Sequence, residues 1–220
     1  MSKPLLHKGR GSISNTAGRF EKQAGVAIDD GWGSLDADLP PLKTKVAIDS
    51  SKSVITYNES PDVPFDRSIN PYRGCEHGCI YCFARPSHAY LGLSPGLDFE
   101  SHILVKPDAA SVLREELGKR NYRCATMALG TNTDPYQPLE RRHKIMRQIL
   151  EVLAETRHPV SIVTKSALVE RDIDLLAAMA KQGLASVFLS VTTLDRRLAR
   201  TLEPRAAAPQ RRLETLAALR

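Results

Sequence analysis

The sequence predicts an α/β fold built on a parallel sheet. Short apolar runs typical of strands alternate along the chain with segments whose apolar residues recur at helical spacing. Such alternation is typical of βα units, in which each helix returns the chain to the same end of the sheet. The 220 residues, of which 42% are hydrophobic and 25% charged, suffice for one core and at most two small domains.

A change in residue pattern divides the chain at about residue 54. The preceding segment is rich in Gly, Ser and Asp and shows no sustained period of a helix or a strand. We therefore expect residues 1–53 to form an extended, largely disordered segment. Residues 54–220 are expected to form the folded core domain.

Four strands are predicted, each leading into a helical segment. They are short apolar runs bounded by turn residues. We expect them at about residues 67–72, 126–129, 160–164 and 186–191. A further run at 103–106, followed by a helix over 109–117, is predicted to be an inserted edge strand. Cys124 lies at the entrance to the second strand, where a buried free cysteine behaves as a small hydrophobe.

Helices follow the later strands. One is predicted by apolar residues at helical spacing, namely Ile145, Met146, Ile149, Leu150 and Leu153. A second covers about 173–180 and ends before Gly183, a residue that commonly terminates helices.

The last helix is predicted over residues 209–220, with Leu213, Leu216 and Ala217 on its apolar face. It reaches the final residue without the Gly or Pro that usually ends a helix. We therefore expect the chain to be truncated, which would leave the edge of the fourth strand without its partner.

Three of the four cysteines lie within eight residues, as Cys75, Cys79 and Cys82. Intervals of three and two residues let one loop wrap a single metal centre. Three thiolates satisfy three irons of a cubane iron-sulfur cluster, so the fourth iron would remain open to a small molecule. The spacing therefore predicts a metal site that supports chemistry.

Two other readings of the cysteines remain open on spacing alone. Zinc could be held by the three thiolates with His77 or His88 as the fourth ligand. In that case the chain would be a zinc-stabilised nucleic-acid-binding module without catalysis, although no second Cys or His pair with knuckle spacing follows Cys82. Disulfides are the weakest reading, because three clustered cysteines leave one unpaired and no secretory signal precedes them.

The residues around the cysteines resemble a known signature. The stretch SINPYRG precedes Cys75, and the aromatic Tyr81 stands directly before Cys82. In this setting the loop resembles that of the radical S-adenosylmethionine (SAM) superfamily. Residues 60–100, together with GTNTDPYQP at 130–138, resemble bacterial members related to spore photoproduct lyase and often labelled DNA repair photolyases. This resemblance covers nearly the whole chain and implies a chemistry rather than a substrate.

The resemblance implies a fold, cofactors and a reaction. The fold would be a partial (β/α) barrel of the radical SAM type, truncated after about four βα units. The cofactors would be a 4Fe-4S cluster on Cys75, Cys79 and Cys82, and SAM on the open iron. An electron from a flavodoxin- or ferredoxin-type donor would release a 5′-deoxyadenosyl radical, which abstracts hydrogen from an unknown substrate in a lyase-like enzyme. The resemblance assigns no catalytic residue.

Polar residues follow each predicted strand, where ligands bind in parallel α/β folds. Asp134 would accept from the SAM ammonium, and Lys165 would donate to its carboxylate. The remaining contacts would come from the hydroxyls of Thr133 and Ser190 and from an aromatic wall, Tyr81 and Phe83, against the adenine. Taken singly, each of these polar residues also fits an ordinary turn, cap or solvated loop.

One position departs from the resemblance. Spore photoproduct lyase carries a hydrogen-donating cysteine just after its second strand, and this chain has Asn132 there. An amide does not readily donate a hydrogen atom. Repair of the thymine photoproduct is therefore not expected.

Charge and hydropathy restrict the partners and the compartment. The formal charge of +6 permits a nucleic-acid partner, but the basic clusters are not interleaved with the aromatic residues that a single-strand platform needs. No membrane span or signal peptide is predicted, because no apolar run is long enough. We expect a cytoplasmic protein, where the thiols stay reduced.

Overall fold

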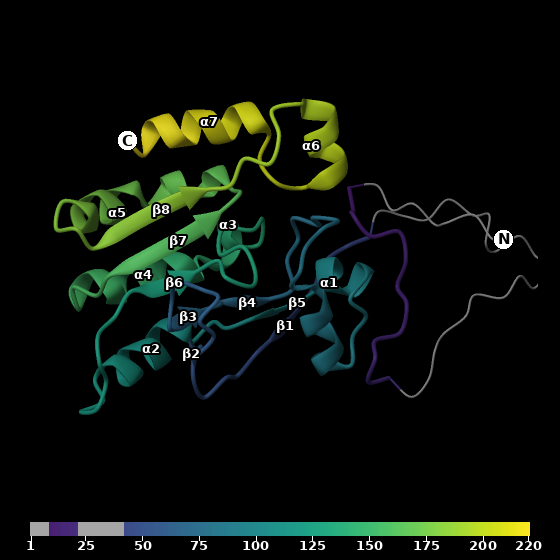
Figure 1. Cartoon of the computed structure of the whole chain (residues 1–220). Helices are drawn as coiled ribbons and strands as arrows, with labels where there is room; N and C mark the ends of the chain where they lie inside the picture. The colour runs from purple at the N-terminus through teal and green to yellow at the C-terminus, as the bar shows by residue number, and fades with distance from the viewer. Residues whose placement is uncertain (1–8, 22–41) are drawn as a thin grey trace, which may run out of the picture.

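Five strands form the main sheet of the protein, in a computed structural model that describes residues 9–21 and 42–220 (Figure 1). The strands are β2 (Ile55–Tyr57), β3 (Arg67–Ile69), β6 (Met127–Leu129), β7 (Val160–Thr164) and β8 (Ala185–Leu189), in that order across the sheet. β2 is antiparallel to β3, and all other neighbours are parallel. The predicted α/β fold with a parallel sheet is confirmed.

A second sheet of three strands has the order β1-β5-β4. Its strands are β1 (Lys45–Ile48), β5 (His102–Val105) and β4 (Tyr72–Arg73). Three expectations are corrected here. The strand expected at 67–72 divides into β3 and β4, which join different sheets. The strand expected at an edge is the central β5, and β1 lies within the segment expected to lack secondary structure.

The segment expected to be disordered is in part ordered. Residues 9–21 lie against the core domain, and Arg10 donates to the carbonyl of Leu42 at 2.8 Å. Gly11 and Ser12 donate their backbone N–H groups to the Glu100 carboxylate at 2.9 and 2.8 Å. The rest of the expectation for residues 1–53 concerns residues 1–8 and 22–41, which lie outside the described residues.

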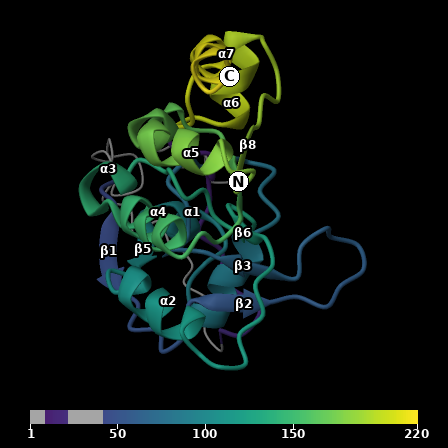
Figure 2. The ribbon, with the colours of Figure 1, turned by 90° about the vertical axis from the view of Figure 1, so that its left-hand side faces the viewer.

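The helices lie mainly on one face of the main sheet, where Figure 2 shows α2, α4 and α5 side by side. The α-helices are α1 (Leu97–Ser101), α2 (Ala109–Leu117), α3 (Glu140–His143), α4 (Ile145–Glu155), α5 (Ile173–Ala180), α6 (Arg196–Leu202) and α7 (Pro209–Ala218). Two 3₁₀ helices, η1 (Arg85–Leu91) and η2 (Ala167–Asp172), complete the set. Within residues 9–21 and 42–220, none of these helices has the length and apolar character to cross a membrane.

The core lies between the main sheet and this helix layer. Leu129 and Ile162 of the sheet are fully buried, as are Ile149 and Leu153 of α4 and Leu113 of α2. Full burial of such a side chain contributes about 2 kcal/mol each. The helix predicted at 145–153 is therefore confirmed, with its apolar stripe facing the sheet.

Two side-chain environments differ from expectation. In α7, Leu213 and Leu216 are each 39% exposed, whereas Arg212 and Thr215 are buried. The helix turns its Arg212 face inward because that guanidinium pairs with the buried Glu203 and donates to the carbonyls of Ser190 and Ala207. Cys124 is exposed, because β6 begins only at Met127 and leaves the cysteine in the preceding loop.

Gly130 ends β6 in a conformation that only glycine adopts freely. Its φ is +85°, and a Cβ there would collide with the carbonyl oxygen of Val163 at the end of β7. Gly183, with a φ of +70°, has no atom near the position of a Cβ. An alanine at Gly183 would therefore meet backbone strain alone, whereas an alanine at Gly130 would meet both backbone strain and a steric clash.

Replacing Gly130 by Ala should lower the free energy of unfolding far more than replacing Gly183 by Ala. Gly183→Ala should cost about 1 kcal/mol through strain alone. Gly130→Ala should cost at least about 3 kcal/mol, because β6 and β7 must also separate. Urea denaturation of both variants measures the difference, and equal losses would contradict the close approach of these two strands.

Candidate functional site

We call residues 75–82, which hold the three clustered cysteines, the cysteine loop. It follows β4 and lies at the carboxyl ends of the parallel strands, on the side toward which the arrows of β7 and β8 point in Figure 1. Cys75 is buried, and its N–H donates to the carbonyl of Phe99 at 2.9 Å. Cys79 and Cys82 are partly exposed. The loop therefore presents one buried and two accessible thiols, as a site open on one side requires.

Cys75 and Cys79 lie in an environment that disfavours free thiolates. Burial raises the pKa of Cys75 well above its usual value, and the charges of Asp134 and Cys79 add to the rise. Burial also raises the pKa of Cys79 to about 11, although the charge of Lys165 opposes this. Bound metal cations would supply the positive charge that holds such thiols ionised. The chemistry of Cys75 and Cys79 therefore fits ligands of an iron-sulfur cluster.

The backbone around Cys75 is held by the segment that follows β6. Asn70 accepts the N–H groups of Asn132 and Thr133 with its Oδ1, at 3.1 and 3.4 Å. Thr133 Oγ1 donates to the carbonyl of Tyr72 at 2.9 Å. These contacts join Asn70 and Tyr72, which precede the first cysteine, to the segment after β6, so we call residues 131–140 the bracing segment.

Gln137 continues this pattern on both sides of Cys75. Its Oε1 accepts the N–H of Glu76 at 2.9 Å, and its Nε2 donates to the carbonyl of Gly74 at 3.1 Å. The side chain is fully buried. One amide thus satisfies two backbone groups that the irregular loop cannot pair by itself. Sequence reasoning missed this role, although Gln137 lies within the recognised GTNTDPYQP stretch.

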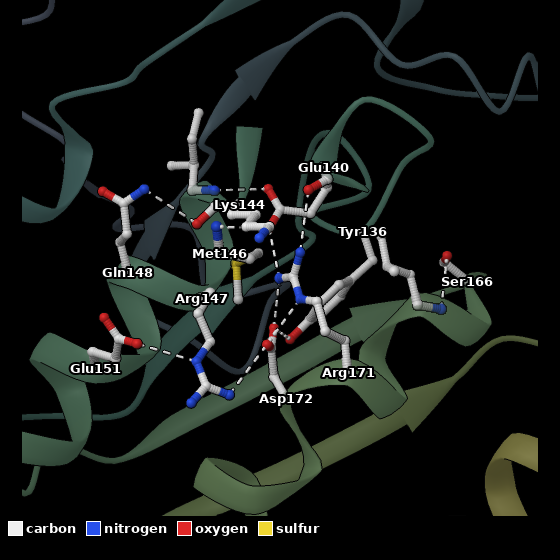
Figure 3. Close-up of polar contacts among 12 residues, drawn as sticks. Tyr136, Glu140, Lys144, Met146, Arg147, Gln148, Glu151, Ser166, Arg171 and Asp172 are labelled. Carbon is white, nitrogen blue, oxygen red and sulfur yellow. Dashed lines mark hydrogen bonds and ion pairs between the residues drawn. The ribbon is translucent and has the colours of Figure 1, made fainter. Parts of the chain in front are cut away.

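A buried ionic network fixes the far end of the bracing segment (Figure 3). Glu140 accepts from Arg171 at 2.7 Å and from the backbone N–H groups of Ile145 and Met146 at 3.0 and 3.1 Å. It also accepts from the hydroxyl of Tyr72.

Asp172 completes this network from the end of η2. It accepts from Arg171 at 2.7 Å and from the hydroxyl of Tyr136 at 3.1 Å. Both carboxylates, Glu140 and Asp172, are fully buried and fully partnered. The network thereby ties β4, η2 and the bracing segment together.

Two further segments hold the loop. Glu100, fully buried in α1, pairs with Arg85 at 2.6 Å and binds the ordered N-terminal segment. On the other side, Ile80 donates its N–H to Leu202, and Arg205 donates its N–H to His77. Three parts of the chain therefore hydrogen-bond to the cysteine loop or its flanks: the bracing segment, α1, and the segment around the end of α6.

Tyr81 and Lys165, two of the predicted SAM contacts, both lie near Cys79. Their contact with SAM stays a prediction. Lys165 Nζ is 5.9 Å from the centroid of the Tyr81 ring. Tyr81 donates to the buried Glu203, which also accepts from Thr192 at 2.6 Å and pairs with Arg212. Sequence reasoning missed Glu203, because nothing nearby in the chain marks it as the partner of Tyr81.

The other predicted SAM residues have varied environments. Asp134 accepts from Thr164 Oγ1 at 2.7 Å, from the N–H of Lys165 at 2.8 Å and from that of Tyr136 at 2.9 Å. Burial opposes its ionisation, but His77 and these donors hold the pKa of Asp134 at about 2. In this structure Asp134 joins the bracing segment to β7, and its contact with SAM stays a prediction.

Thr133, Ser190 and Phe83 are also only partly available to a ligand. The hydroxyl of Thr133 is committed to the backbone of Tyr72, and that side chain is buried. Ser190 donates its N–H to Thr164 and accepts from Arg212 at its carbonyl, which leaves its hydroxyl free of these bonds. Phe83 is 79% exposed, so it forms little of an aromatic wall here.

The two histidines considered as zinc ligands have other neighbours. His88 Nε2 bonds to the carbonyl of His102 at 2.9 Å, and His77 Nδ1 lies 3.2 Å from Asp134 Oδ2. A zinc ion requires ligands that converge on one point. In the described ranges, 9–21 and 42–220, no three Cys, His, Asp or Glu side chains converge in this way, and this holds for Cys75, Cys79 and Cys82 as well. The finding therefore does not distinguish a zinc ion from an iron-sulfur cluster.

Comparison with known proteins identifies the family of the chain. The family model of the Radical SAM superfamily matches residues 69–220. An uncharacterized protein of Mycobacterium tuberculosis is 46% identical over 158 residues, which cover 72% of this chain and 46% of that protein. One of Methanocaldococcus jannaschii is 28% identical, covering 69% of this chain and 54% of its own length. The chain thus spans about half the length of these curated relatives.

Solved structures show the same fold. A mutant spore photoproduct lyase with bound AdoMet and dinucleoside spore photoproduct superposes with a TM-score of 0.55 at 16% identity, covering 79% of this chain and 47% of that one. Spore photoproduct lyase complexed with dinucleoside spore photoproduct gives a TM-score of 0.54 at 15% identity, with the same coverage. At these identities the similarity establishes the fold alone.

Gln137→Ala should lower both the free energy of unfolding and the iron content after reconstitution. The substitution leaves the Gly74 carbonyl and the Glu76 N–H unpaired beside Cys75, at a cost of about 3 kcal/mol. Gln210→Ala, on the exposed face of α7, should cost about 0.5 kcal/mol or less. Urea denaturation and iron analysis measure both effects, and identical behaviour of the two variants would contradict the bracing role.

Proposed function

Because the chain belongs to the radical SAM superfamily, we propose that it holds a 4Fe-4S cluster on Cys75, Cys79 and Cys82 and binds SAM at the open iron. Members of this family use these two cofactors. When bound, the cluster and SAM together supply a 5′-deoxyadenosyl radical for hydrogen abstraction. The carrying observation is the braced loop of three free thiols at the carboxyl ends of the parallel strands.

In this proposal the residues of the chain bind SAM and hold the cysteine loop in position. Lys165 donates a charge-assisted hydrogen bond to the SAM carboxylate, and Tyr81, held by Glu203, lies against the adenosyl group. The bracing segment positions the loop backbone through the hydrogen bonds of Gln137 on both sides of Cys75. The four free cysteines suit a reducing compartment such as the cytoplasm.

The substrate of the proposed reaction differs from the thymine photoproduct. Asn132 stands where spore photoproduct lyase carries its hydrogen-donating cysteine, and its N–H is bound to Asn70 at 3.1 Å. We propose a lyase-like reaction in which hydrogen is taken from another substrate and electrons come from a flavodoxin- or ferredoxin-type donor.

Cys79→Ala should abolish cluster binding, whereas Cys124→Ala should leave it unchanged. Cys79 is one of the three loop thiols, and Cys124 is exposed in a loop before β6. The variants are compared by iron and sulfide content after anaerobic reconstitution and by 5′-deoxyadenosine released from SAM on reduction. Equal loss in both variants would contradict the assignment of the loop.

Lys165→Ala should weaken SAM binding about tenfold while leaving the iron content unchanged, because one charge-assisted hydrogen bond is lost. The matched control is Lys181→Ala, at the end of α5, which should bind SAM normally. Equilibrium dialysis of SAM with the reconstituted variants measures the affinities. A normal affinity in Lys165→Ala would remove this residue from the cofactor site.

A further inference from the structure

A cavity of about 670 Å³ adjoins the cysteine loop and has no role in the proposed reaction. Its wall combines His77 of the loop with the start of η2 and with the connection between α6 and α7. Four arginines line it, together with one carboxylate: Arg141, Arg171, Arg205, Arg211 and Glu170. The volume suits a small organic molecule.

Most of the charged side chains in the wall already have partners. The chemistry of a ligand is therefore set by the donors that remain unpaired. Arg211 forms two hydrogen bonds to Glu170, at 2.7 and 2.6 Å, and Arg171 binds the buried Glu140 and Asp172. Arg205 uses its NH1 for Glu76 at 3.1 Å. Arg141 makes no side-chain hydrogen bond or ion pair with any described residue. The whole guanidinium group of Arg141 therefore remains available to donate hydrogen bonds. The N–H groups of Arg205 that do not face Glu76 remain available as well.

His77 adds a buried polar group with an unused edge. Its side chain is 3% exposed, it lines the cavity, and its Nδ1 lies 3.2 Å from Asp134 Oδ2. Within the described part of the chain, Nδ1 is buried and forms no hydrogen bond. With Nδ1 turned to the carboxylate, Nε2 on the opposite edge is left for a ligand.

The remainder of the wall is mixed in character. Ser166 accepts the N–H of Leu168 at 3.2 Å, which leaves its hydroxyl proton for a ligand. Pro138, Ala206 and Ala207 give small apolar surfaces between the polar groups. Free guanidinium and hydroxyl donors select a ligand rich in acceptors, and guanidinium groups match phosphate and carboxylate oxygens.

We infer that this cavity binds a small hydroxylated organic anion, with its phosphate or carboxylate on Arg141 and Arg205 and a hydroxyl on His77. This site is distinct from the proposed SAM contacts Tyr81 and Lys165, neither of which lines the cavity. Through His77 it borders the loop that carries the cysteines. Occupancy therefore places an anion next to the cysteine loop.

The inference is tested by calorimetric titration of the reconstituted chain with ribose 5-phosphate and with citrate, at constant ionic strength. The two probes separate a phosphate from a carboxylate source, and neither contains adenine. One saturable site is expected for at least one probe. Arg141→Ala should weaken it about tenfold. Arg142→Ala, the neighbouring exposed arginine of α3 outside the cavity wall, should bind like the unchanged chain.

Three results would overturn the inference: no saturable binding of either probe, an equal effect of Arg141→Ala and Arg142→Ala, or displacement of the probe by SAM. Displacement by SAM would mean that the probe binds at the cofactor site and not in a separate cavity. Repeating the titration on the chain without iron separates this inference from the proposed radical chemistry. If the chain does not bind a cluster, the titration of the iron-free chain still tests whether the cavity binds the probe.

Discussion

The conformation of the cysteine loop depends on hydrogen bonds that other parts of the chain supply. An irregular loop buried at the end of a sheet cannot pair its own backbone groups, and each unpaired group carries a large cost. The bracing segment meets this constraint by pairing backbone groups of Tyr72, Gly74 and Glu76, while the side chain of Asn70 accepts a backbone N–H of the segment in return. The hydrogen bonds around the first cysteine therefore come largely from the segment after β6.

Buried carboxylates carry this arrangement outward. Glu140, Asp172, Glu100 and Glu203 are each nearly or fully inaccessible, and each has an arginine partner. Such pairs contribute modest net stability, but removal of one partner leaves a buried charge and costs several kcal/mol, about 3–5. Their effect here is largely positional, because Arg171–Glu140, Arg85–Glu100 and Arg212–Glu203 each join two segments that lie near the cysteine loop.

Local patterns predicted the strands and helices well and the tertiary contacts poorly. Apolar runs gave β6, β7 and β8, and helical spacing gave α4. The inward face of α7 was predicted wrongly, because hydropathy does not reveal that Glu203 neutralises Arg212. The assignment of Cys75, Cys79 and Cys82 as metal ligands stays a prediction from their spacing, and Tyr81 and Lys165 lie near each other in the structure. Gln137 and Glu203 escaped notice because their partners are backbone groups or residues distant in the chain.

The measurement that tests the account most directly is electron paramagnetic resonance of the reconstituted, reduced chain before and after addition of SAM. A loop that leaves one iron open predicts a reduced-cluster signal whose g-values shift when SAM binds to that iron. A spectrum unaffected by SAM, or a protein that retains stoichiometric zinc and no cluster, would contradict the assignment of Cys75, Cys79 and Cys82 as an open cluster site.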